Sequence, residues 1–270
     1  SNPATVELFN LIGFDKRKPY ESGLFRYKNR SCDLAAAGFK IINKNDTPTL
    51  QIAVKLHKMI NVWDICEVSA QFDTDLDGEL DLELGGILST GLSGLSALIS
   101  EKGHYSVLID SKRAKEVRLA YEKLVRESEG TTDKSANYRE AVKGIFDMTV
   151  YNQSTISVIE VPLNALELKN KSKLRMKIAT MSYHGENIES DDFFGIEEKW
   201  QSLTVQEDSQ GHVELPMAIS LAPQEKTKVT MRKGAGKHKL MALIPTNLSF
   251  GPKIEQNDRQ MLIIKHNYED

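Results

Sequence analysis

The sequence is poor in the features that usually reveal a chemistry. Cysteine occurs only twice in 270 residues, at Cys32 and Cys66, and neither belongs to a CxxC pair, which argues against a zinc site. The six histidines show neither an HExxH motif nor another close metal-ligand spacing. No GxSxG motif marks a nucleophilic serine. We therefore predict no catalytic residue in this chain.

Long apolar runs and a strong charge of one sign are also missing. The longest uncharged segment, Leu84 to Ser100, is interrupted by glycines and is too short for a membrane-spanning helix. The formal net charge of −3 argues against a general nucleic-acid binder, whose surface would be basic. We expect a soluble globular protein with neither a membrane span nor a nucleic-acid partner.

The sequence does not decide whether the two cysteines are joined in a disulfide or are free thiols. They can form one disulfide in an oxidising compartment, or they can be ordinary buried thiols. The chain begins at Ser1 without an initiator methionine, and we expect it to be a piece of a longer protein. An export signal would then lie upstream in that protein.

The segment DTDLDGELD, from Asp73 to Asp81, carries the clearest chemistry in the sequence. It sets carboxylates at loop positions 1, 3, 5 and 9 and a glycine, Gly78, at position 6. Calcium takes six to eight oxygen ligands at about 2.3 to 2.6 Å, and alternate aspartates in a tight turn converge on one point. We predict a structural calcium site with the ligands Asp73, Asp75, Asp77, Glu79 (through its backbone carbonyl) and Asp81. The alternative is a solvated turn, because Asp and Gly suit turns without a metal.

The flanks of this loop predict strands and not the helices of an EF-hand. Position 12, where an EF-hand has a bidentate glutamate, is Leu84. Apolar residues alternate with polar ones in 68–72 before the loop and in 80–84 after it. The ion is therefore expected to stabilise a turn between two strands.

Similar alternation recurs along the chain and predicts the fold class. It is found at 50–56, 105–109, 146–150 and 174–178, and apolar runs follow at 157–161, 240–244 and 261–264. So many short strands predict a mainly β protein, an antiparallel β-sandwich of the Ig-like or jelly-roll-like kind. We expect the sandwich domain to span 1–206. Residues 207–270 would add strands to the same sandwich or form a small second β subdomain.

A two-helix insertion is expected at about 111–144. Apolar residues at helical spacing in 117–124 follow Asp110 and Ser111 as candidate caps, and the same spacing recurs in 138–145. Each predicted helix has one apolar stripe, and we expect that stripe to pack on one end of the sandwich. A partner-docking arm is the alternative.

Four segments read together resemble a known family. They are 67–84 (EVSAQFDTDLDGELDLEL), 146–168 (FDMTVYNQSTISVIEVPLNALEL), 173–183 (KLRMKIATMSY) and 261–267 (MLIIKHN). In this order they resemble the C-terminal accessory region of large secreted subtilisin-like serine proteases. The resemblance covers about half of the chain, and the helical segment that begins at Ser111 has no place in the family pattern.

The resemblance implies a non-catalytic role for this chain and a serine endopeptidase as its parent. The protease motifs themselves are absent, since His184-Gly185 is followed by Glu186 and not by threonine. A calcium-binding accessory domain would support folding, substrate docking or surface attachment, and its partner would be the parent catalytic domain or a protein substrate. Such a domain is secreted, or lies at the cell surface or in the periplasm. The alternative is a free-standing extracellular adhesion or glycan-binding β module.

Overall fold

The protein is almost entirely built of β-strands. The computed structural model describes residues 4–15, 32–60, 66–88, 103–128, 136–150, 154–168, 173–184, 187–193, 201–204, 219–221, 238–243 and 261–266. Its strands are β1 (Ala4–Phe14), β2 (Leu34–Lys44), β3 (Thr47–Ile60), β4 (Cys66–Asp73), β5 (Leu82–Leu88), β6 (His104–Asp110), β7 (Val142–Val150), β8 (Ser154–Pro162), β9 (Lys173–His184), β10 (Asn187–Phe193), β11 (Gln201–Thr204), β12 (Ile219–Leu221), β13 (His238–Leu243) and β14 (Met261–His266).

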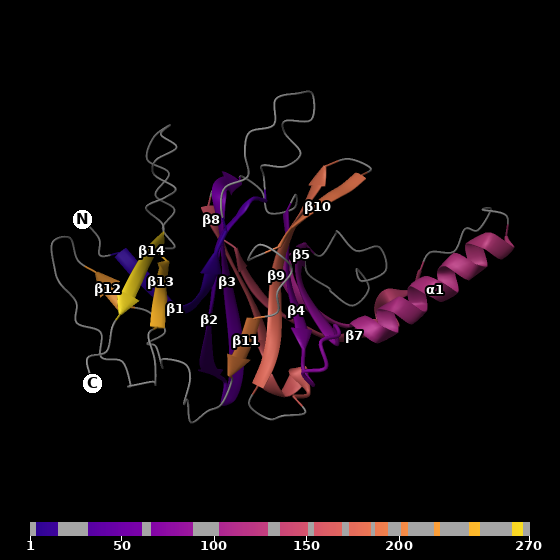
Figure 1. The fold of residues 1–270 in the computed structure, drawn as a ribbon, viewed down its shortest axis with the longest axis horizontal. Helices are drawn as coiled ribbons and strands as arrows, with labels where there is room; N and C mark the ends of the chain where they lie inside the picture. The colour runs from indigo at the N-terminus through magenta and orange to yellow at the C-terminus, as the bar shows by residue number, and fades with distance from the viewer. Residues whose placement is uncertain are drawn as a thin grey trace.

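One curled antiparallel sheet contains all of these strands. The hydrogen-bonded order is β10-β9-β4-β5-β6-β7-β8-β3-β2-β1-β13-β14, and β11 and β12 pair with β9 and β1 beside this path. Strand β7 pairs with β6 on one side and with β8 on the other, so it joins the two halves into one half-barrel (Figure 1). The predicted mainly β, antiparallel architecture is confirmed. The two separate sheets of a sandwich are not confirmed, because the pairing through β7 is continuous.

The main core lies between the two halves of the curled sheet. It combines side chains of β2 and β3 with those of β4, β5 and β9. Fully buried members include Leu34, Leu50, Ile52, Phe72, Leu84 and Leu174. Each such side chain contributes about 1.5 to 3 kcal/mol when it leaves water. Phe72 directly precedes Asp73, so the predicted metal loop begins from a rigid, fully buried strand end.

A disulfide links the two halves of the sheet. Cys32, just before β2, is bonded to Cys66, the first residue of β4, with the Cα atoms 5.6 Å apart, a normal span for a disulfide. The hydroxyl of Thr180 on β9 donates a hydrogen bond to the Cys32 carbonyl at 2.6 Å. The alternative of two buried thiols is therefore not what the structure contains.

The first predicted helix is present as α1 (Ser111–Glu127). It begins at the expected place, because the Asp110 carboxylate accepts the Arg113 backbone N–H at 2.9 Å as an N-cap. The helix extends away from the strands (Figure 1) and contains no buried residue, and Leu119 is 47% exposed. The expected packing of its apolar stripe over the sheet is not observed.

The second predicted helix is wrong. Residues Tyr138–Ala141 form one 3₁₀ turn, and β7 starts at the next residue. The backbone of β7 pairs with β6, with Val142 opposite Ile109 and Gly144 opposite Leu108. Glycine is a poor helix former, and pairing with a neighbouring strand outweighs a helical spacing of only a few residues.

The C-terminal strands lie beside the N-terminal one. Strands β12 and β13 both pair with β1, and β14 pairs with β13. The division at residues 206 and 207 stays a prediction. Across the ranges given above, no helix is both long enough and apolar enough to cross a membrane.

Candidate metal site

The aspartate loop connects the adjacent strands β4 and β5. Asp73 ends β4, and the Asp81 backbone N–H closes the turn by donating to the Phe72 carbonyl at 2.9 Å. Leu76 and Gly78 have φ values of 67° and 94°. Gly78 suits the second of these conformations because it has no Cβ. A strand hairpin with an aspartate-rich turn, as predicted, therefore carries the candidate site.

The aspartates themselves fold the loop. The Asp73 carboxylate accepts the Gly78 backbone N–H at 2.9 Å through Oδ2. Asp75 accepts the Asp77 N–H at 3.3 Å, and Asp77 accepts the Glu79 N–H at 2.8 Å. These Asx-type bonds curl the backbone around the carboxylates and hold several of them on the inner side of the turn.

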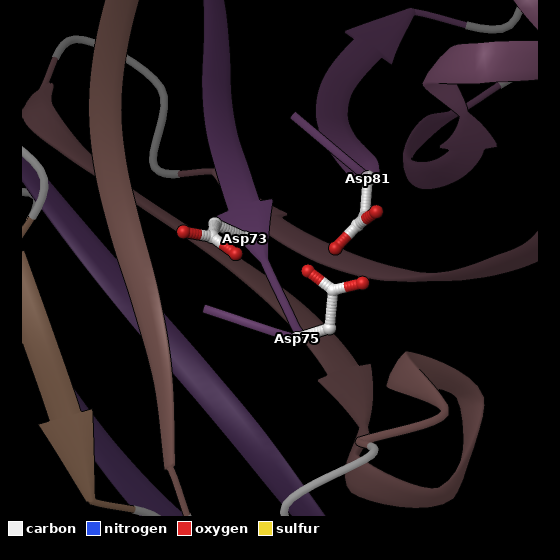
Figure 2. A group of neighbouring side chains, drawn as sticks. All are labelled: Asp73, Asp75 and Asp81. Atoms are coloured by element: carbon white, nitrogen blue, oxygen red, sulfur yellow. The ribbon is translucent and has the colours of Figure 1, made fainter. Parts of the chain in front are cut away.

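Three of the predicted ligands converge. Asp73, Asp75 and Asp81 each offer a carboxylate oxygen, and these oxygens lie within 4.8 Å of one another. Figure 2 shows the carboxylates of Asp75 and Asp81 facing each other, with Asp73 beside them at the end of β4. Carboxylates brought so close repel one another because they carry the same charge. A cation between them would relieve this repulsion. Three carboxylates at this spacing can hold a metal ion.

One oxygen of this group has no hydrogen-bond partner among the described residues. It is the Oδ1 atom of Asp73, a fully buried side chain. A buried polar atom that lacks a hydrogen-bond partner costs roughly 1 to 3 kcal/mol, even where the other oxygen of its carboxylate is paired. This atom belongs to the carboxylate that ends β4 and takes part in the convergence, so it is the strongest sign of a missing ligand.

The other two predicted ligands lie apart from the group. Asp77 and Glu79 are both exposed, and neither is among the three converging carboxylates. The role predicted for the Glu79 backbone carbonyl stays a prediction. The arrangement brings together loop positions 1, 3 and 9.

Two basic side chains that belong to no sequence motif flank the group. Arg175 on β9 lies 3.5 Å from the Oδ2 atom of Asp73. Lys112, in the first turn of α1, lies 3.1 Å from the Oδ1 atom of Asp81. In the sequence these two residues are recognisable only as members of a strand and a helix, and they come close to the loop only if those elements lie beside the loop strands. Sequence alone does not provide those pairings.

The carboxylates of the loop interact with the Lys112 ammonium. Its hydrogen bond to Asp81 raises the pKa of Lys112, and the charges of Asp81, Asp77 and Asp75 raise it further. Burial raises the pKa of Asp81, but hydrogen bonds from Thr74 and Lys112 outweigh that effect and bring the pKa below its usual range. Asp81 is therefore a carboxylate at neutral pH, the form that binds metals.

Comparisons with protein-family models, with curated proteins and with solved structures find no match to this chain.

Proposed function

We propose that this chain is a non-catalytic, calcium-stabilised β domain of an exported protein. Its parent would be a subtilisin-like serine endopeptidase, which the domain helps to fold, to dock substrate or to attach to a surface. The observation that carries the metal part is the buried, unpartnered Oδ1 atom of Asp73 within a group of three carboxylates. The order of the four resembling segments supports the family part.

Calcium fits the donor set better than other metals. Among the described residues, all the donors of this group are hard carboxylate oxygens, without the sulfur or imidazole that zinc or copper would favour. The three oxygens lie within 4.8 Å of one another, which is close enough for all of them to contact one ion. Asp73, Asp75 and Asp81 would hold the ion, with further oxygens from the loop or from water.

A structural role follows from the position of the site. The loop joins two interior strands of the sheet. The Asp81 backbone N–H donates to the Phe72 carbonyl on β4, and the Asp81 carbonyl accepts the Ser111 N–H at the start of α1. An ion there neutralises the converging charges and fixes the turn between β4 and β5. The reaction of the parent enzyme would take place elsewhere, in a catalytic domain.

The disulfide supports export. Disulfides persist in oxidising compartments and are rare in the cytosol, where thiols stay reduced. Extracellular calcium modules work with dissociation constants of about 10⁻⁴ to 10⁻³ M, so external calcium can saturate even a modest site. The bonded cysteines and the carboxylate loop thus support the same location, outside the cytoplasm.

Thermal unfolding in calcium and in chelator tests the proposal. Calcium at about 100 times its dissociation constant stabilises the native state by about 2.7 kcal/mol, or roughly 5 to 10 °C for a chain of this size. Asp75→Asn should lose most of this shift while keeping the turn acceptor for Asp77. The matched control is Asp46→Asn, an exposed aspartate in the β2–β3 turn, which should respond to calcium like the wild type.

Two results would count against the proposal. Equal midpoints for the wild type in calcium and in chelator would refute a structural calcium site. A calcium shift that survives in Asp75→Asn would place the ion elsewhere. Magnesium at the same concentration is expected to stabilise less, because it demands a tighter octahedral shell.

A further inference from the structure

The first turn of α1 lies against the candidate metal loop. Strand β6 pairs with β5 so that Asp110 stands opposite Leu82, the residue that follows the loop. The Ser111 backbone N–H then donates to the Asp81 carbonyl at 2.9 Å. The helix therefore starts at the loop itself, and its second residue, Lys112, reaches the carboxylate of Asp81.

Lys112 lies beside the oxygen of Asp81 that has the fewer other partners. The Oδ2 atom of Asp81 already accepts the backbone N–H of Thr74 at 2.9 Å and its hydroxyl at 3.0 Å. The Oδ1 atom is the one with room for another ligand, and the Lys112 ammonium lies 3.1 Å from it. An ammonium and a divalent cation beside the same carboxylate oxygen repel each other, because both are positive.

Arg175 is placed differently. It lies 3.5 Å from the Oδ2 atom of Asp73, which also accepts the Gly78 N–H. The buried Oδ1 atom of Asp73 has no partner among the described residues. An ion at that Oδ1 atom would therefore meet a different oxygen from the one that Arg175 approaches, whereas an ion at the Oδ1 atom of Asp81 would meet the same oxygen as Lys112.

We propose that Lys112 is a built-in competitor of calcium, which holds Asp81 when the ion is absent and is displaced when the ion binds. This inference rests on the calcium site proposed above. Lys112 then sets the calcium affinity, and occupancy of the loop is coupled to the first turn of α1. The Lys112 side chain is 57% exposed, so its displaced ammonium is readily solvated and the competition is modest.

Calcium titration by calorimetry at low ionic strength tests the competition. Lys112→Met removes the ammonium and keeps a long side chain, and it should bind calcium with about a threefold to tenfold lower Kd. Lys112→Arg keeps the positive charge and should retain the wild-type Kd within about twofold. The matched control is Lys123→Met, farther along the same exposed helix and paired with Glu127 at 3.7 Å, which should leave the Kd unchanged.

Thermal unfolding in chelator supplies a second readout. Without calcium, Lys112→Met leaves Asp81 without its ammonium partner, so the midpoint of the variant should fall below that of the wild type. With saturating calcium the two midpoints should agree. A general packing defect would instead lower both midpoints.

The outcomes separate this inference from the function on which it rests. If the wild type binds calcium and Lys112→Met binds with the same or a higher Kd, the competition is refuted and the calcium site stands. If neither protein binds calcium, both proposals fail. If only Lys112→Met binds, the competition is upheld in its strongest form and the calcium role of the wild-type loop fails.

Discussion

Glu67 makes the stability of this protein depend on pH. It lies on β4, on the face opposite to Phe72, and it is only partly exposed. Burial raises the pKa of Glu67 to about 7, and the charge of Glu83 on the neighbouring strand adds to the effect. Glu83 is itself held in place by the Ser69 hydroxyl, whose oxygen lies 2.5 Å from it.

The sign follows from the proton balance. Between pH 4.5 and about 7 the folded protein holds a proton on Glu67 that the unfolded chain has released. The stability tied to this proton is complete below about pH 4.5 and is lost as the pH rises through about 7. The gap between the two pKa values of 4.5 and about 7 corresponds to at most about 3 kcal/mol.

Replacing the carboxyl with a neutral amide of the same shape removes this dependence. Glu67→Gln should match the wild type near pH 5 and exceed its free energy of unfolding at pH 8, by up to about 3 kcal/mol. Urea unfolding at half-unit steps from pH 5 to pH 8, in chelator throughout, measures the difference. The aspartate loop is the same in both proteins, so its contribution to the difference cancels.

Glu122→Gln serves as the control, since Glu122 is an exposed residue of α1. Its stability should follow the wild type at every pH. A difference between Glu67→Gln and the wild type that stays constant from pH 5 to pH 8 would refute the reasoning. Such a constant offset would mean that the change acts through packing and not through a proton.

Three further predictions address the fold. Replacing Cys32 and Cys66 together with serine should cost about 4 kcal/mol in urea unfolding, because the bond closes a loop with a sequence separation of 34. Asp110→Ala should lower the free energy of unfolding by about 1 kcal/mol and speed hydrogen exchange in the first turn of α1, since it removes the N-cap. Gly86→Ala should lower the melting temperature at a cost of about 1 to 3 kcal/mol, because the added Cβ would lie 2.7 Å from the Ile159 side chain.

Local patterns predicted the features that depend on neighbouring residues. Alternation in 68–72 and 50–56 indicated β4 and β3, since side chains on a strand alternate between its two faces. Asp110 was expected as a cap, because capping requires only a carboxylate within reach of an N–H three residues away. The aspartate spacing likewise predicted a turn whose carboxylates converge, and three of them do.

Features that depend on distant strand pairs were not predictable in the same way. The contact of Arg175 with Asp73 requires β4 to pair with β9, a segment about 100 residues away. The disulfide requires the start of β4 to lie beside the residue just before β2, in the other half of the curled sheet. The helix predicted over 138–145 failed for the same reason, because pairing of β7 with β6 decides its backbone. A pattern that repeats every few residues contains no information about which distant strand a segment pairs with.

The two flanking cations bear directly on whether the loop needs a metal. If Lys112 and Arg175 fully balanced the group, each converging oxygen would have a donor. Asp73 contradicts this, because Arg175 and Gly78 both approach its Oδ2 atom and leave the buried Oδ1 atom with none. A fully buried carboxylate oxygen without a partner is among the costliest polar arrangements, and a divalent cation bound between Asp73, Asp75 and Asp81 would remove that cost. The two cations thus approach the Oδ1 atom of Asp81 and the Oδ2 atom of Asp73, and a metal ion would supply the partner that the Oδ1 atom of Asp73 lacks among the described residues.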